Sequence, residues 1–235
     1  MSVEVKTGNI FTSQCQTLVN TVNCVGVMGA GIALECRLRY PAMFKKYEKL
    51  CEAHRFSPGL LWLYKGGSDE SDINDKWVLN FPTKVHWKYP SKIEWVCAGL
   101  DKFVSIYREK QIVSIAFPVL GGLNGGLDPE EVISVMQSKL SVCDIPIEIY
   151  QYSSGASDDL YDEFKKKFLK MSPDDISNLI KMQKQYIRRV VVALENPDIH
   201  QLNQLAKVEG VGGRTLEKAF QLMRVHHKIQ GELDI

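Results

Sequence analysis

The first two-thirds of the chain alternates short apolar segments with longer segments of helical periodicity. Period-two alternation and short apolar runs are typical of strands, and a repeat near 3.6 residues is typical of helices. The pattern predicts strands at residues 3–6, 17–22, 59–64, 76–80, 112–119 and 146–152. It predicts helices over residues 31–40, 42–54 and 93–110 and another that begins at Pro129, with Asp128 as its cap and Glu131 completing a capping box. Alternating strands and helices indicate an α/β fold, a sheet covered by helices.

Beyond about residue 160 the pattern is helical only. A charged amphipathic helix is expected over 160–171, and a second helix, capped by Ser172 with Pro173 at its first position, is expected to run toward residue 194. Two short helical stretches flank residues 209–213. We therefore predict two domains, an α/β domain at 1–155 and a small all-helical domain at 160–235.

Composition narrows the class of protein. The 235 residues are 45% hydrophobic and 24% charged with a net charge of +1, which excludes a disordered chain and a globally basic nucleic-acid coat protein. No apolar run approaches the ~20 residues that span a bilayer, and the first residues lack a signal-peptide pattern. The six cysteines are scattered singly, so we expect buried or idle thiols, no metal and no cofactor. These features predict a cytoplasmic protein without a membrane partner.

Two glycine-rich segments, 21–33 and 121–127, each lie between a predicted strand and a predicted helix. Glycines let the backbone approach a ligand closely, and the amides that open a helix bind phosphate. Neither segment has the Walker or the G-x-G-x-x-G spacing, so each alone could be a tight structural turn. Together, at the carboxyl ends of sheet strands, they favour a crevice for a diphosphate.

Lys84 follows a predicted strand within Asn-Phe-Pro-Thr-Lys-Val-His-Trp, residues 80–87. Apolar surroundings lower the pKa of a lysine and make a neutral, nucleophilic amine accessible. The same pattern also fits a surface lysine whose stem lies beside aromatic rings. Spacing alone leaves both interpretations open.

Five segments, residues 8–10, 18–23, 26–33, 80–87 and 120–128, read Gly-Asn-Ile, Leu-Val-Asn-Thr-Val-Asn, Gly-Val-Met-Gly-Ala-Gly-Ile-Ala, Asn-Phe-Pro-Thr-Lys-Val-His-Trp and Leu-Gly-Gly-Leu-Asn-Gly-Gly-Leu-Asp. In this order they resemble a macrodomain of the DarG-type antitoxin branch, over about residues 1–152. The resemblance implies a mixed sheet between helices with ADP-ribose in a cleft at its crest. It also implies removal of ADP-ribose from DNA bases on which a partner toxin, a DNA ADP-ribosyltransferase, has placed it.

The resemblance assigns roles to individual residues. Lys84 matches the lysine on which glycohydrolysis depends in this branch, and Tyr150 or Tyr152 could flank the adenine. Asn9 and Ile10 would lie near the adenine, Asn23 would hold the distal ribose, and the two loops would enclose the diphosphate. The complete set of implied ADP-ribose contacts is Asn9, Ile10, Asn20, Asn23, Val27, Met28, Gly29, Ala30, Gly31, Ile32, Thr83, Gly121, Gly122, Leu123, Asn124, Gly125, Gly126 and Leu127.

The chain departs from the family pattern in two places, at Asn9 and in the second loop, and from a related branch in a third. Asn9 stands where many macrodomains have aspartate, and the second loop has Gly-Gly-Leu-Asn in place of Gly-Cys-Gly-Leu. A related branch carries a catalytic aspartate where Gly125 falls here. Asp128 is better interpreted as a helix cap, which leaves Lys84 without an obvious carboxylate partner.

Residues 202–220 look like a helix-hairpin-helix, a module that holds DNA phosphates without reading sequence. Glycines allow the tight turn and the next helix opens toward an anion; the candidate DNA contacts are Gly210, Gly212, Arg214 and Lys218. Residues 181–230 hold nine Lys/Arg against four Asp/Glu, a local excess of five. An ordinary helical hairpin is the alternative, and no close match to the toxin-binding segment of DarG relatives is seen.

Three functions fit these features. The first is a hydrolase that releases ADP-ribose from DNA bases and acts as antitoxin to a DNA ADP-ribosyltransferase. The second is a reader that binds ADP-ribose without turning it over, for which a desolvated Lys84 would have no use. The third is a hydrolase of protein-linked, acetylated or phosphorylated ADP-ribose.

Overall fold

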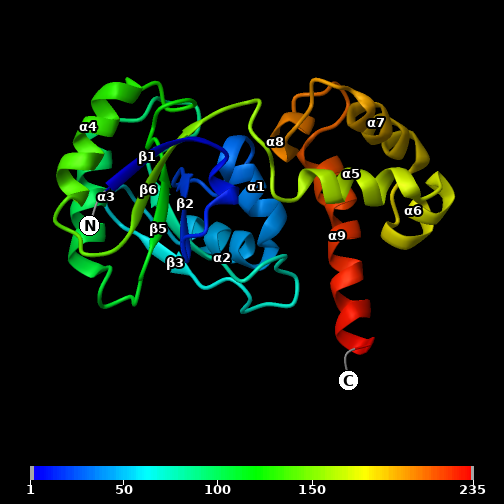
Figure 1. The fold of residues 1–235 in the computed structure, drawn as a ribbon, viewed down its shortest axis with the longest axis horizontal. Coiled ribbons are helices and arrows are strands. Elements are labelled where there is room, and N and C mark those ends of the chain that lie inside the picture. The colour runs from blue at the N-terminus through cyan, green and yellow to red at the C-terminus, as the bar shows by residue number, and fades with distance from the viewer. Residues whose placement is uncertain (1–2, 234–235) are drawn as a thin grey trace.

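A six-stranded mixed sheet forms the centre of the α/β unit, which extends from β1 to β6 (Figure 1). The computed structural model describes residues 3–233, with side chains for residues 3–224. The strand order is β1-β6-β5-β2-β4-β3, and every neighbouring pair is parallel except β3 with β4. The strands are β1 Val3–Gly8, β2 Thr17–Val22, β3 Trp62–Tyr64, β4 Trp77–Pro82, β5 Ile115–Pro118 and β6 Ile147–Tyr152.

Helices cover both faces of the sheet. A short 3-10 turn (Ile10–Thr12) follows β1, and α1 (Gly31–Arg39) and α2 (Pro41–Glu52) pack on one face over Leu18, Val22 and Val78. On the opposite face, α3 (Ile93–Ile106) and α4 (Pro129–Leu140) enclose the second core. The predicted α/β fold is confirmed.

Each predicted element of this unit corresponds to an element of the structure, with shifted ends. Asp128 caps α4 by accepting a hydrogen bond from the amide of Glu131 at 2.9 Å, as predicted. The strand predicted at residues 112–119 is shorter, because Ile112 is buried in the turn that precedes β5. Continuous burial, rather than continuous strand geometry, produced the apolar run.

The remaining helices, α5 to α9, form a second unit beside the first. The prediction of a single helix from residue 173 to about 194 is wrong. Two helices occupy this stretch, because Lys181 adopts a left-handed conformation with φ of 51° that ends the first of them, α6. The stretch after the 209–213 turn is also a long helix rather than a short one. The helices are α5 Tyr161–Lys170, α6 Pro173–Ile180, α7 Lys184–Glu195, α8 Leu202–Leu205 and α9 Gly213–Leu233.

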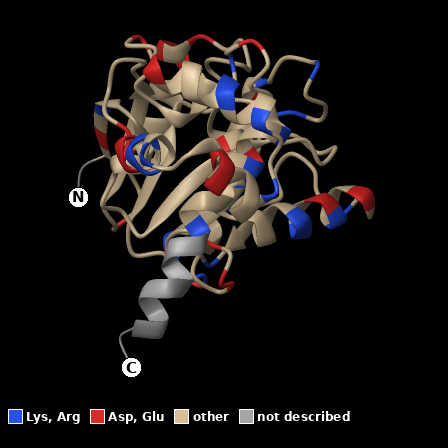
Figure 2. Ribbon diagram, turned by 90° about the vertical axis from the view of Figure 1, so that its right-hand side faces the viewer, with Lys and Arg blue, Asp and Glu red and all other residues tan. Residues whose placement is uncertain are grey.

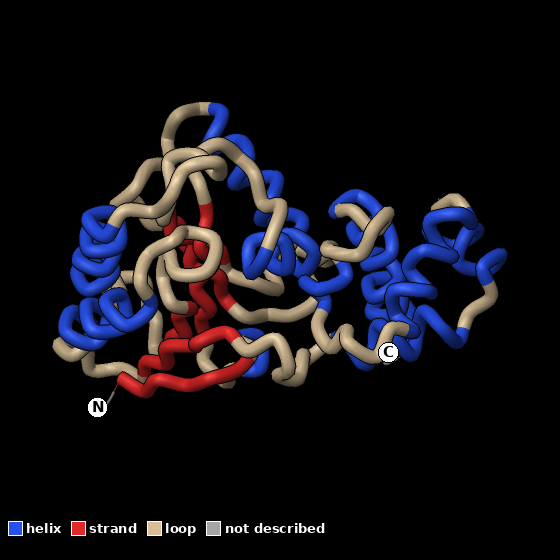
Figure 3. Tube along the Cα trace, turned by 90° about the horizontal axis from the view of Figure 1, so that it is seen from above, coloured by secondary structure: helices blue, strands red, loops and turns tan. Residues whose placement is uncertain are grey.

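Helix α1 joins the two units. Leu34 and Leu38 on this helix belong to the hydrophobic core of the helical unit. Arg39 donates to both carboxylate oxygens of Asp159 at 2.8 and 2.6 Å. Figure 3 shows the helical unit beside the helix–sheet–helix layers rather than on top of the sheet. The boundary at 155–160 stays a prediction, and the last two residues of the expected helical domain lie outside the described part.

No helix in the described part of the chain is both long and apolar enough to cross a membrane. All six cysteines are unpaired thiols, four of them buried. Within residues 3–224, no cluster of three or more His, Cys, Asp and Glu side chains could hold a metal ion.

Candidate active site

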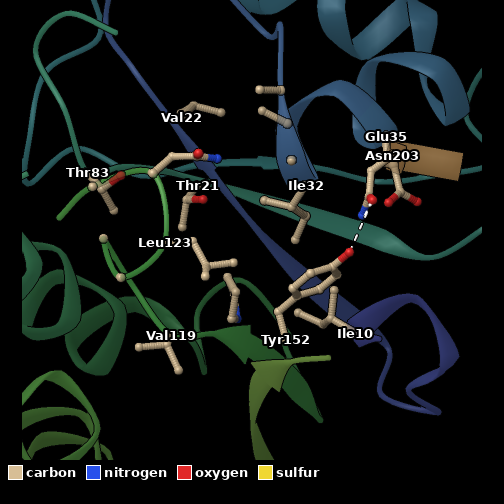
Figure 4. Close-up of a pocket in the computed structure, with 18 of the residues that line it drawn as sticks. Ile10, Thr21, Val22, Ile32, Glu35, Thr83, Val119, Leu123, Tyr152 and Asn203 are labelled. Atoms are coloured by element: carbon tan, nitrogen blue, oxygen red, sulfur yellow. Dashed lines mark hydrogen bonds between the residues drawn. The ribbon is translucent and has the colours of Figure 1, made fainter. Parts of the chain in front are cut away.

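A cavity of about 890 Å³ opens where the parallel strands end. Its walls include Thr21 and Val22 at the end of β2, Thr83 after β4, and Val119 after β5. Figure 4 shows these side chains around the cavity together with Ile32 at the start of α1. Ligands of open α/β sheets bind at the carboxyl ends of strands, and the volume suits a nucleotide-sized molecule.

The first loop is held in shape by Asn23, which is 7% exposed. Its Oδ1 accepts hydrogen bonds from the amides of Val25 at 3.0 Å and Val27 at 3.3 Å, and its Nδ2 donates to the carbonyl oxygen of Val27 at 2.5 Å. The Tyr47 hydroxyl donates to the carbonyl oxygen of Asn23 at 2.8 Å. The Asn23 side-chain amide therefore stabilises the conformation of the loop along one wall of the cavity.

Helix α1 begins at the cavity wall. Its N-cap residue is Ala30, which has no side chain that could accept from the first-turn amides. Gly31, Ile32 and Ala33 in that turn all line the cavity. Unsatisfied amides at a helix N-terminus together with the positive end of its dipole favour an anionic ligand.

The second loop depends on glycine at position 125. A Cβ there would lie 2.2 Å from the carbonyl oxygen of Gly121 and 2.5 Å from the Ser91 hydroxyl. The aspartate of the related branch therefore has no room in this loop. The two loops also meet, because a Cβ on Gly31 would lie 3.1 Å from the Nδ2 of Asn124.

Lys84 reaches the point where the loops meet. Its ammonium donates a hydrogen bond to the main-chain carbonyl of Asn124, and the residue is half-buried in the cavity wall. Burial lowers the pKa of the Lys84 amine from its ordinary value. Among the described lining residues Glu35 is the one acid, and Figure 4 shows it across the cavity from Thr83, the neighbour of Lys84. Within the described lining, the one carboxyl group therefore lies on the side of the cavity away from Thr83 and Lys84.

Most of the predicted contacts meet at this cavity. Those that line it are Asn9, Ile10, Asn23, Val27, Gly29, Ala30, Gly31, Ile32, Thr83, Lys84, Gly121, Gly122, Leu123, Asn124 and Gly125. Four predicted contacts, Asn20, Met28, Gly126 and Leu127, are not part of the lining. Asn20 is fully buried and donates to Asn80 at 2.9 Å, and Met28 is fully buried in the core behind the first loop.

The sequence did not single out three polar residues of the lining: Glu35, Asn203 and Lys207. Glu35 is 1% exposed, and burial raises its pKa to about 7 although the Arg39 guanidinium at 3.3 Å opposes that shift. Asn203 and Lys207 come from the helical unit. The available signal for Glu35 was an acid between Leu34 and Cys36 in a predicted helix, whereas no local pattern links residues 203 and 207 to the loops.

The turn of the predicted hairpin follows the cavity residue Lys207 closely in the chain, but its residues 209–213 are not part of the lining. Gly210 adopts a φ of 77° in the turn between α8 and α9. Arg214 is exposed on α9, whereas Lys218 donates to the carbonyl oxygen of Lys181 at 2.6 Å and so satisfies the end of α6. Figure 2 shows Lys and Arg interspersed with Asp and Glu over the helical unit.

The α/β unit is similar in sequence and in structure to known proteins. The chain is 42% identical over 150 residues to the Mycobacterium tuberculosis "DNA ADP-ribosyl glycohydrolase", a match that covers 63% of this chain and 42% of that protein. It is 36% identical over 155 residues to a Thermosipho africanus "DNA ADP-ribosyl transferase-DNA ADP-ribosyl glycohydrolase fusion protein", covering 61% and 40%. The chain thus matches less than half of the length of these relatives.

The structure of the Mycobacterium tuberculosis DarG macrodomain superposes with a TM-score of 0.60 at 40% identity, covering 64% of this chain and 98% of that one. The family profile described as "Macro domain" matches residues 19–136, just over half of the 235 residues and the segment that holds both loops and Lys84. The chain therefore belongs to the macrodomain family.

Proposed function

We propose that the cleft binds ADP-ribose and that the chain hydrolyses the bond between ADP-ribose and a DNA base. The observation that carries the proposal is the Lys84 amine, partly desolvated and placed where two anion-binding loops meet. The names of the relatives, which describe DNA ADP-ribosyl glycohydrolases, support the same substrate. A protein that only binds ADP-ribose would use the loops without this amine.

In this proposal the two loops hold the diphosphate while Lys84 acts on the sugar. Cleavage of a glycosidic bond passes through an oxocarbenium-like state, for which most glycosidases use two carboxylates. Here the neutral Lys84 amine attacks the anomeric carbon while the bond from that carbon to the base breaks, and the base leaves with the proton that the amine loses. The adduct on Lys84 is the glycosylamine or, after ring opening, the Schiff base. Water then hydrolyses the new carbon–nitrogen bond, which releases ADP-ribose and restores the amine. The lowered pKa of Lys84 enlarges the fraction of neutral amine at neutral pH.

The hairpin of the helical unit is proposed to hold DNA near the cleft. Support comes from the left-handed Gly210, the exposed Arg214 and the first turn of the long helix α9. If Arg214 contacts phosphate, Arg214→Glu weakens retention of an oligonucleotide and lessens the salt dependence of binding. Lys166→Glu, an exposed lysine on α5, is the matched control. Equal retention by both variants would remove DNA contact from the proposal.

An antitoxin role is the wider proposal. The Thermosipho africanus relative joins a DNA ADP-ribosyl transferase to a glycohydrolase in one chain, which favours a transferase as cognate partner. Such a system acts on DNA in the cytoplasm, where unpaired thiols stay reduced. Co-expression with the transferase should restore growth with the native chain and not with Lys84→Ala.

The direct test follows free ADP-ribose released from an oligonucleotide with ADP-ribosylated thymidine or guanosine and, in parallel, from an ADP-ribosylated protein. The native chain should act on an oligonucleotide, Lys84→Ala should not, and Lys102→Ala, an exposed lysine on α3, should match the native chain. Binding without release would identify a reader, and release from protein alone would identify a protein-directed hydrolase. Either result would contradict the proposal.

A further inference from the structure

The end of the cleft remote from Lys84 is built by both units of the chain. Glu35 comes from α1, Asn203 from α8, and Lys207 from the turn after α8. Figure 4 shows the hydrogen bond between Asn203 and Tyr152, with Glu35 on the same side of the view, while Thr83 lies at the other side of the cavity. The macrodomain alone therefore does not complete this wall.

Asn203 holds the ring of Tyr152. The Tyr152 hydroxyl donates to the Oδ1 of Asn203 at 3.2 Å, and both residues line the cavity. This bond spans the boundary between the units and favours one orientation of the ring. An aromatic ring offers a flat surface on which a nucleobase can stack.

Helix α8 is anchored, so Asn203 has a defined position. The Nε2 of Gln201 donates to the carbonyl oxygens of Ser153 at 2.7 Å and Ala156 at 2.9 Å. The amide of Leu202 donates to the Oδ2 of Asp158 at 3.0 Å, and Asp158 lies 3.5 Å from the buried Arg39 of α1. These bonds tie α8 to the segment after β6 and, through Arg39, to the helix that carries Glu35.

Asn9 supplies a donor without a partner to the same cavity. Asn9 is 4% exposed, and its Oδ1 accepts from the amide of Phe11 at 3.1 Å. Its Nδ2 is buried and unpaired within the described structure. A buried donor of this kind costs stability unless a ligand acceptor satisfies it.

The polar groups at this end match one face of a purine. Along its N1–C6 edge, adenine combines the ring nitrogen N1, an acceptor, with the amino group at C6, a donor. The unpaired Asn9 Nδ2 can donate to the former, and the oxygens of Glu35 and Asn203, which line the same cavity, can accept from the latter. Hypoxanthine, with N1–H and a C6 carbonyl, has a donor where adenine has the acceptor and an acceptor where adenine has the donor.

We propose that the helical unit is part of the nucleotide site, with Asn203 and Glu35 accepting from the adenine amino group, Tyr152 covering the ring and Lys207 attracting the anionic ligand. This inference rests on the proposed ADP-ribose binding and assigns part of its base selectivity to Asn203, which lies outside the macrodomain match, beside Glu35, which lies within it. Lys207 is exposed, so its attraction depends on salt, whereas the Asn203 contact does not.

The test is calorimetric titration of the full chain with ADP-ribose and with its hypoxanthine counterpart, IDP-ribose. The native chain should prefer ADP-ribose by about tenfold, and Asn203→Ala should lose most of that preference. Tyr152→Phe, which keeps the ring and removes the bond to Asn203, should lose less. Lys207→Ala should weaken the binding of both nucleotides by about threefold at low salt and by less at high salt.

Matched controls on the same unit are Asn178→Ala and Lys166→Ala, both exposed and remote from the cavity lining. Equal affinity of the native chain for both nucleotides, or variants at 203 and 207 that match the controls, would overturn the inference while ADP-ribose binding stands. Failure of the native chain to bind ADP-ribose at all would overturn the proposed function itself. Thermal unfolding of each variant separates loss of contact from loss of fold.

Discussion

The two ends of the cleft are built by opposite means. At the Lys84 end, glycine loops of one unit present main-chain groups and a single amine. At the Glu35 end, side chains of two units meet around a buried ion cluster, in which Arg39 lies within 3.5 Å of Glu35, Asp158 and Asp159. The first arrangement suits chemistry on a bound sugar, and the second suits rigid recognition. The stability of the molecule is therefore expected to depend on the Glu35 end far more than on the Lys84 end.

The largest expected effect on stability is that of Arg39→Met. Removal of the guanidinium, which is fully buried, leaves three carboxyl groups in the junction between the units without the cation that they share. Removing one partner of a buried ionic cluster costs about 3–5 kcal/mol of unfolding free energy. Denaturant unfolding measures this, and a loss below about 1 kcal/mol would show that the cluster does not join the units.

The next effect is a dependence on pH that originates in Glu35. Burial raises its folded-state pKa to about 7, from 4.5 for the exposed group. A raised pKa means that the protonated form stabilises the fold below the unfolded value, and that this contribution is lost as the pH rises through about 7. Glu35→Gln should remove a slope of as much as about 1.4 kcal/mol per pH unit between these values. Parallel stability–pH curves for the two proteins would refute this assignment.

A substitution in the glycine loop at the Lys84 end should have a smaller effect on stability and a clear effect on ADP-ribose binding. Gly125→Ala places a Cβ against the carbonyl oxygen of Gly121, so the loop must open at a cost of about 1–3 kcal/mol. ADP-ribose affinity should fall together with stability. Gly155→Ala is the control, because a Cβ there meets nothing within 4 Å. Unchanged affinity in Gly125→Ala would mean that this loop does not shape the site.

The smallest effect is expected at a surface contact between the same two units. Arg37 pairs with Glu217 at 2.7 Å, and both side chains are partly exposed. Arg37→Met should therefore cost about 0.5–1 kcal/mol, a small fraction of the effect at Arg39 two positions along the helix. Denaturant unfolding measures the loss of unfolding free energy in each variant, and the loss at Arg39 should be several times the loss at Arg37. Equal losses would show that the buried and the exposed link contribute alike.

The sequence predicted the Lys84 end better than the Glu35 end. Strand periodicity, glycine spacing and the family resemblance located both loops and Lys84, because these signals lie within short segments. The wall at Asn203 depends on packing between residues far apart in the chain, for which hydrophobic periodicity carries no information. The break at Lys181 was missed because nothing in the composition marks a lysine that adopts a positive φ.

The proposed chemistry requires that the Lys84 amine reach the anomeric carbon of the sugar. Its most direct test is borohydride reduction during turnover of an ADP-ribosylated oligonucleotide, followed by mass spectrometry of the peptide that contains Lys84. The account predicts an ADP-ribose adduct on Lys84 in the native chain, and no adduct and no release in Lys84→Ala, which still binds free ADP-ribose. Rapid release by Lys84→Ala, with no adduct at position 84 in the native chain, would contradict it.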